Sequence, residues 1–182
     1  LFLVSALALR FAFPAVSTDG RAALVLRTLP HSPAAHLLAR WAVRAVPSVL
    51  AALLLAGVSA AVLAVRGFPL AAALAAAAVG GLAIPALQLG LGALFPRYDA
   101  PNPVSVALGP GGLFAMALST LLAAVPVLFV SEGLRSLFET LLGARIDPAL
   151  LLAAWGAVAA ALAAGAMAAA ARRLPKADLS AS

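Results

Sequence analysis

The sequence predicts an all-α fold, a polytopic membrane helix bundle with four complete transmembrane helices and the end of a fifth. Hydrophobic residues make up 65% of the 182 residues and charged residues only 10%. A soluble domain holds about 45–50% apolar and about 25% charged residues. The charges also leave uncharged intervals of 21, 30, 32 and 24 residues, and about 20 apolar residues cross a bilayer. Together these observations exclude a soluble globular domain.

The limits of the spans follow from the charges and the prolines. We expect transmembrane helices over 45–65, 69–95, 108–130 and 148–171, all within one transmembrane domain, 1–182. Each opens at or near a proline, and proline suits the first turn of a helix because its missing N–H has no partner there. The prolines are Pro47, Pro69, Pro110 and Pro148. Residues 1–13 are apolar without the features of a signal peptide, and we interpret them as the end of a span that begins before Leu1.

The basic residues predict the orientation, because cytoplasmic loops carry an excess of Arg and Lys. If 14–44 is cytoplasmic, nine of the twelve basic residues lie inside and three outside. The tail 172–182 is then also cytoplasmic, and the protein is a multi-pass protein of the cell membrane. The net charge of +6 therefore reflects topology and contact with lipid headgroups, and the pattern does not indicate nucleic-acid binding.

The segment 14–44 predicts a helix, a break and a second helix. Ser17, Thr18 or Asp19 can cap a short helix that runs to about Leu29 and ends at Pro30. Ser32 and Pro33 then form an N-cap and first-turn pair.

The second of these helices has a basic face, because His36, Arg40 and Arg44 recur every four residues. Two interpretations stay open. The face could meet lipid phosphates as an interfacial helix, or it could be a docking surface for a cytoplasmic partner.

Two further loops are polar. The stretch 96–107, PRYDAPNPVSVA, predicts a rigid extended turn rather than a helix, because residues before proline favour extended geometry. The segment 131–147 predicts an amphipathic helix on the outer side. It carries leucines and a phenylalanine at helical spacing opposite Arg135 and Glu139, and Ser131 can cap it. We expect it to be interfacial or re-entrant.

Residues with catalytic potential are sparse. Gln88 is the one side-chain amide inside the predicted spans, and its expected role is a hydrogen bond between helices. No acidic residue or histidine lies within a span, which disfavours a proton-driven transporter.

Motifs for nucleotide or metal binding are missing from the sequence. It holds no phosphate loop, since Lys176 is its one lysine, and His31 and His36 have no third zinc ligand nearby. We therefore expect no metal, no cofactor and no enzyme activity in this chain.

Two stretches carry a family resemblance. RFAFPAVSTDGRAALVLRTLPHSPAAHLLARW (10–41) and LGLGALFPRYDAPNP (89–103) resemble patterns in the membrane subunits of ABC-2 type exporters, in particular the ABC exporter permease group. The matching positions of the first stretch include Asp19, Gly20, Arg27, Pro30, Ser32 and Arg40. Those of the second are Pro96, Arg97, Tyr98, Asp99, Asn102 and Pro103. The chain departs from the family at Asp19 and Arg40, where glutamate and lysine are common, and at His31, where an aliphatic residue is usual.

The resemblance implies a six-helix bundle of which this chain holds the last five spans. Segment 14–44 would be a coupling helix that sits on a separate ABC-type ATPase subunit, with Asp19, Arg21 and Arg27 as the expected partner contacts. It also implies short outer helices between the last two spans and a homo- or heterodimer of permease subunits.

The function expected from the sequence is therefore the transmembrane permease subunit of an ATP-driven exporter. The alternative is a membrane protein outside the ABC class, either a fragment of a secondary carrier or a membrane scaffold. A membrane enzyme is a third possibility, in which Asp99 would be the residue to test. The transported substrate cannot be inferred, because the spans are mostly Ala, Leu and Val.

Overall fold

The computed structural model describes residues 1–19, 32–97, 102–131, 136–137, 139–141, 143 and 147–174. Within these residues every regular element is helical, and the predicted all-α bundle is confirmed. The elements in chain order are α1 (Phe2–Phe11), the 3-10 turns η1 (Phe13–Ala15) and η2 (Ser17–Asp19), α3 (Pro33–Val62), α4 (Phe68–Leu94), α5 (Pro103–Ala107), α6 (Pro110–Val130) and α8 (Pro148–Arg173).

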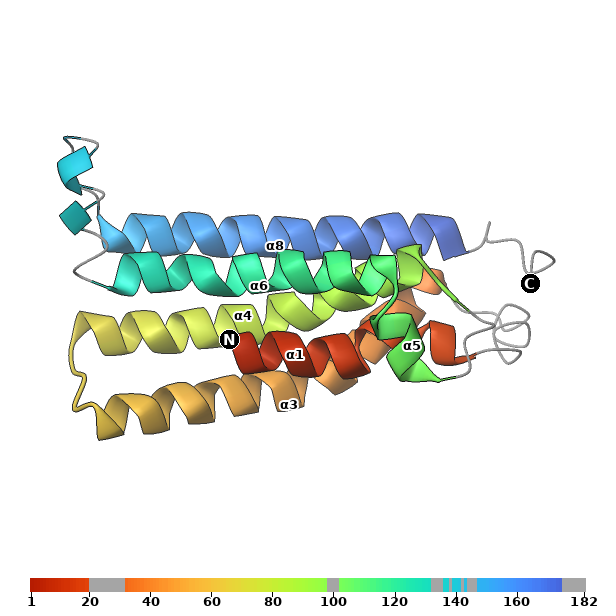
Figure 1. Ribbon diagram of the computed structural model, residues 1–182, viewed down its shortest axis with the longest axis horizontal. Coiled ribbons are helices and arrows are strands. Elements are labelled where there is room, and N and C mark those ends of the chain that lie inside the picture. Colours follow the sequence, from red (N-terminus) through yellow and green to blue (C-terminus); the bar gives the residue numbers. More distant parts are fainter. Residues whose placement is uncertain are drawn as a thin grey trace.

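Four of the described helices, α3, α4, α6 and α8, are long and apolar enough to cross a membrane. The mean hydropathy of their most apolar stretches is 2.0 to 2.2. They run side by side along the long axis of the molecule, with the shorter α1 among them (Figure 1). The α3–α4 connection, the end of α6 and the start of α8 lie at one end, whereas η2, α5 and the end of α8 lie at the other (Figure 1). The chain is thus a multi-pass membrane protein.

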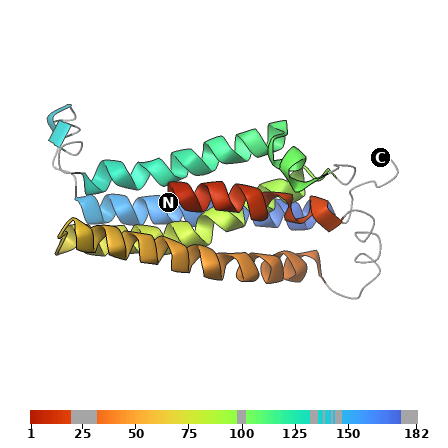
Figure 2. The same ribbon diagram turned by 60° about the horizontal axis from the view of Figure 1, so that its bottom comes forward.

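Helix α4 is the centre of the bundle and packs against α1, α3, α6 and α8. Figure 2 shows α3 and α6 on opposite sides of it. Small residues permit the close packing. A Cβ on Gly81 would lie 2.8 Å from the Cα of Val49, and one on Gly90 would lie 2.7 Å from the carbonyl carbon of Ala166. Glycine at such positions lets helix backbones approach closely within a membrane.

Helix α3 corrects one predicted boundary. Ser32 is its N-cap, and the Ser32 Oγ accepts a hydrogen bond from the Ala35 N–H at 3.2 Å, as the sequence indicates. The helix then continues without a break through residue 44, so Pro47 lies inside α3 and not in the first turn of a separate span. A single internal proline removes one backbone hydrogen bond, which membrane helices tolerate when nearby groups compensate.

The loop 96–107 corrects a second prediction, because its last part is the helix α5. The Asn102 Oδ1 accepts a hydrogen bond from the Ser105 N–H at 2.8 Å, and Pro103 occupies the first turn. Asn and Pro in this order form an N-cap and first-turn pair. Asn102 keeps the extended backbone that residues before proline favour, and the helix begins after it at Pro103.

The polar segments near 17–31 and 131–147 are described in part. Ser17, Thr18 and Asp19 form η2, and the helix expected from there to Leu29 lies outside the described residues. Ser131 ends α6 as its C-cap. Of the outer amphipathic segment, residues 136–137 and 139–141 are helical, and Leu137 and Leu141 are 60% and 80% exposed.

Candidate functional site

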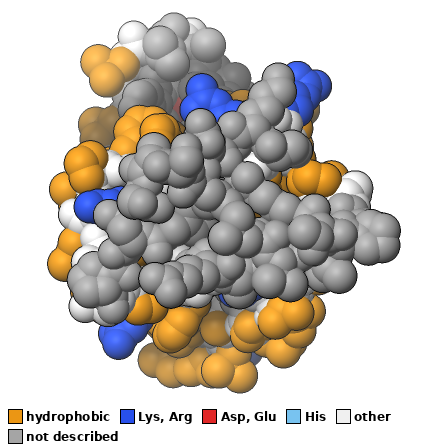
Figure 3. Space-filling model, turned by 90° about the vertical axis from the view of Figure 1, so that its right-hand side faces the viewer, with side chains coloured by type: hydrophobic (Ala, Val, Ile, Leu, Met, Phe, Trp, Pro, Cys, Tyr) orange, Lys and Arg blue, Asp and Glu red, His pale blue; other side chains and the backbone are white. Residues whose placement is uncertain are grey.

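Basic residues gather at one end of the bundle. We call it the basic end and define it by the described arginines Arg10, Arg40, Arg44, Arg97, Arg172 and Arg173. Figure 3 looks onto this end and shows arginine side chains around its rim. Among the described residues, Arg66 is the one arginine at the opposite end. The basic end therefore carries the segments that the charge pattern predicts to be cytoplasmic.

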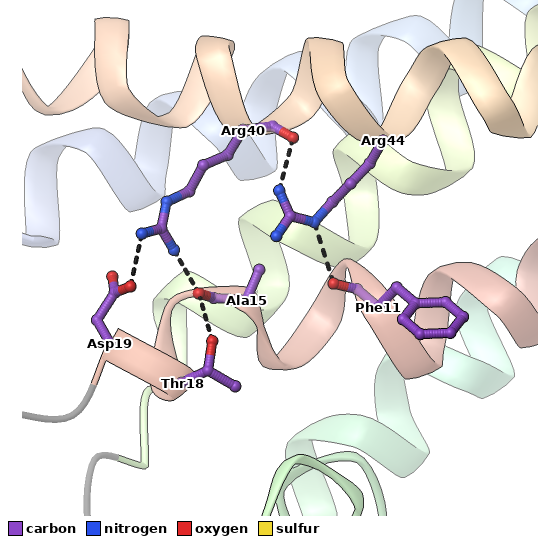
Figure 4. A network of polar contacts seen from close by, with 6 residues as sticks. All are labelled: Phe11, Ala15, Thr18, Asp19, Arg40 and Arg44. Carbon is purple, nitrogen blue, oxygen red and sulfur yellow. Dashed lines mark hydrogen bonds and ion pairs between the residues drawn. The ribbon is translucent and has the colours of Figure 1, made fainter.

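Arg40 of α3 connects the two sides of segment 20–31. Its Nη2 lies 2.6 Å from the Asp19 Oδ1, and its Nη1 donates to the carbonyl oxygen of Ala15 in η1 (Figure 4). The Ala15 carbonyl also accepts a hydrogen bond from the Thr18 hydroxyl at 3.0 Å. The side chains of Arg40 and Asp19 are only 18% and 16% exposed. Asp19 immediately precedes segment 20–31. The ion pair therefore fixes the start of this segment, which we call its base, to α3.

Arg44, one turn further along α3, holds the end of α1. Its Nε donates to the Phe11 carbonyl oxygen at 3.0 Å and its Nη1 to the Arg40 carbonyl oxygen at 2.8 Å (Figure 4). Phe11 is the last residue of α1. Cations stabilise a helix C-terminus because the last carbonyl groups lack intrahelical partners and carry partial negative charge. Two arginines of α3 thus fasten the ends of α1 and η1.

Ser17 connects the base of segment 20–31 to the loop after α4. Its Oγ accepts a hydrogen bond from the Arg97 backbone N–H at 3.0 Å. Close packing supports this contact. Gly92, near the end of α4, abuts the Phe13 carbonyl so closely that a Cβ on the glycine would collide with the carbonyl oxygen. The bases of the two polar loops, 20–31 and 98–101, are therefore joined.

The residues assigned to partner coupling from the sequence fall into two groups. Asp19, Ser32 and Arg40 are described, and all three form contacts within the chain. Gly20, Arg21, Arg27 and Pro30 lie outside the described residues. The interpretation of Arg40 as part of an outward basic face is corrected, because its guanidinium turns toward η1 and Asp19. The spacing of Arg40 and Arg44 in the sequence shows that they share a helix face. It does not show which carbonyl groups accept hydrogen bonds from them.

The residues of the second loop divide similarly. Arg97 contributes its backbone N–H to Ser17, Asn102 caps α5, and Pro103 is in the first turn of α5. Pro96 is among the described residues, whereas Tyr98 and Asp99 lie outside them. The role of Ser17 was missed. A serine next to a capping threonine and aspartate gave no signal that it would contact residue 97.

A second polar cluster lies inside the membrane-spanning part. Gln88 of α4 donates from its Nε2 to the Ser119 hydroxyl at 2.7 Å and to the Ser5 carbonyl oxygen at 3.1 Å. The Ser5 hydroxyl donates to the Ser119 Oγ at 2.6 Å. All three side chains are buried, and the Gln88 Oε1 has no protein partner among the described residues. Gln88 thus links α4 to α1 and α6 by hydrogen bonds, which is the role that the sequence predicts for it.

Comparison with known proteins supplies a family. The chain matches, over residues 1–179, a family described as "Putative ATP-binding cassette". Searches among curated proteins and among solved structures gave no match. Since the match covers almost the whole chain, the chain belongs to this family.

The membership confirms the coarser part of the resemblance seen in the sequence. The protein is a membrane component of an ATP-binding-cassette system, with four helices fit to span the bilayer. The family description names an ATP-binding cassette and does not name a permease. The role of this chain within the system must therefore be argued from its own residues.

Proposed function

We propose that this protein is the transmembrane permease subunit of an ATP-binding-cassette exporter. In this role a separate nucleotide-binding subunit hydrolyses ATP, and this chain converts the resulting movement into a change of helix tilt. The proposal is supported by the family match over residues 1–179 and by the connection between segment 20–31 and the spans.

The division of labour follows from the residues. ATP hydrolysis of the P-loop type needs a glycine-rich loop with a lysine at the phosphates. These 182 residues hold no such motif, and their one lysine is Lys176. Their four apolar helices are instead suited to line a path across the bilayer. We therefore assign the ATP site to a partner subunit.

The observation that carries the proposal is the set of contacts at the base of segment 20–31. The Asp19–Arg40 ion pair ties that base to α3. Arg44 ties α3 to the end of α1, and Ser17 ties η2 to Arg97 in the loop that follows α4. A force applied to segment 20–31 thus reaches three helices through short polar contacts. Coupling of this kind needs an element with two arrangements that a ligand biases, and ATP binding in the partner would supply the bias.

Co-purification tests the proposal. The tagged chain is solubilised from its own membranes, and the eluate is assayed for a P-loop protein and for ATPase activity. Arg27→Glu reverses the charge at an expected partner contact, and like charges across an interface cost several kcal/mol. We expect recovery of the ATPase subunit to fall at least tenfold. Arg66→Glu, at the opposite end, is the matched control and is expected to leave recovery unchanged.

Two results would overturn this function. One is purification of the intact chain without any nucleotide-binding protein. The other is full ATPase recovery and coupling in Arg27→Glu.

A further inference from the structure

A pocket of about 250 Å³ lies between α1, α3 and α4 near the basic end. Its rim is formed by apolar residues that face outward, and Leu7, Phe11 and Val43 are 39%, 59% and 74% exposed. Pro85 of α4, which is buried, also lines it. The pocket thus opens on the exposed apolar surface of the bundle and extends inward to the central helix.

Arg44 lines the same pocket, and within the described residues no carboxylate forms a salt bridge with it. Its neighbour Arg40 is paired with the carboxylate of Asp19. Arg44 has carbonyl partners only among the described residues, and these take two of its five N–H groups. The remaining three can donate to an anion.

A second cation lies next to a residue of the pocket wall. The guanidinium carbon of Arg10 lies 6.0 Å from the ring centroid of Phe11, and Phe11 itself lines the pocket. The pocket therefore combines an apolar interior with one lining arginine, Arg44, and a second arginine next to the lining residue Phe11.

The depth of Arg44 in the membrane can be calculated from α3. From residue 44 to the end of the helix at Val62 there are 18 steps, which at a rise of about 1.5 Å span about 27 Å. The hydrocarbon core is about 30 Å thick. With Val62 at one boundary of the core, Arg44 lies at the other, at the level of the lipid headgroups.

We propose that this pocket binds one anionic phospholipid, with the phosphate and the acidic headgroup at Arg44 and Arg10 and part of an acyl chain in the apolar interior. Arginine matches phosphate geometry through paired N–H groups. Basic pockets between membrane helices bind acidic headgroups for the same reason. A lipid fits better than a soluble anion because the pocket wall is apolar and its rim faces the hydrocarbon region.

Native mass spectrometry of the detergent-purified protein tests the site, with phosphatidylglycerol and phosphatidylcholine added in turn. We expect one retained phosphatidylglycerol and little phosphatidylcholine. Arg44→Gln is expected to weaken retention of phosphatidylglycerol about fivefold, since each basic residue near an anionic lipid contributes roughly that factor. Arg66→Gln, at the opposite end, is the matched control and should retain the lipid fully.

A second pair of variants keeps the test decisive if Arg44→Gln fails to fold. Arg44→Lys keeps the charge and should retain most of the preference for the acidic lipid. Leu7→Trp adds bulk at the exposed rim and should reduce retention of phosphatidylglycerol while both arginines remain. Equal retention of the two lipids by the unmodified protein, or unchanged retention in both Arg44→Gln and Leu7→Trp, would overturn the proposal.

Discussion

At the scale of single residues, two arginines one turn apart on α3 have different partners. Arg40 forms an ion pair with Asp19, whereas Arg44 donates hydrogen bonds to two backbone carbonyl oxygens, those of Phe11 and Arg40. Among the described residues, their shared face therefore holds one ion pair and one arginine without a carboxylate in salt-bridge contact. We propose that Arg40 transmits force from segment 20–31 to α3 and that Arg44 binds the headgroup of a lipid.

A double-mutant cycle measures the ion pair. Asp19→Asn and Arg40→Gln should each lower the free energy of unfolding by about 1–2 kcal/mol, because each leaves a largely buried charge without its partner. The double variant should lose less than the sum of the two, by about 1 kcal/mol, since the residues are in direct contact. Denaturation in mixed micelles gives these values. Strict additivity would contradict a direct Asp19–Arg40 interaction.

At the scale of elements, the sequence predicted the long helices well, because hydropathy and charge spacing are enough to define a membrane span. It failed where local signals competed. Pro47 suggested a helix start, but Ser32 had already provided one thirteen residues after the end of η2. Pro103 suggested an extended turn, but Asn102 capped a helix there. A sequence pattern does not show which of two competing helix-start signals prevails, because that depends on which neighbouring groups form hydrogen bonds with the backbone.

The candidate site shows the same limit. Its location could be predicted, since Asp19 and Arg40 stood in a recognisable pattern. Their contact with each other, and the links from Ser17 to Arg97 and from Arg44 to Phe11, depend on how α1, α3 and α4 pack. Such pairs are up to 80 positions apart in the chain, and no periodicity in one helix indicates them.

A comparison of two glycines tests the packing of α4. In Gly92→Ala the new methyl group would lie 2.8 Å from the Phe13 carbonyl carbon, so η1 must move away from α4. Overpacking of this kind costs about 1–3 kcal/mol, and we expect a loss of stability in that range together with weaker coupling. Gly165→Ala on α8 is the matched control, because its methyl group would meet nothing within 4 Å. Equal thermal stability of the two variants would contradict the close contact between η1 and α4.

At the scale of the whole molecule, the described arginines are divided between the ends of the bundle almost as the charge count required. Six lie at the basic end and one, Arg66, at the opposite end. The fold thus places at one end the segments predicted to be cytoplasmic, which are separated in the sequence by segments of the opposite end. The proposed function depends on the basic end facing the cytoplasm, where ATP is hydrolysed, so the orientation is the property of the whole molecule that most needs a test.

Single cysteines can measure this orientation cleanly, because the sequence contains no cysteine. Arg66→Cys and Leu141→Cys place a thiol at exposed positions of the end opposite to the basic end, and Ala34→Cys and Val104→Cys place one at exposed positions near the basic end. A membrane-impermeant maleimide should label the first pair in intact cells and the second pair only after permeabilisation, because the excess of positive charge stays inside. The opposite pattern would place segment 20–31 outside the cell. No cytoplasmic ATPase could then reach that segment, so the result would contradict the proposed coupling as well as the orientation.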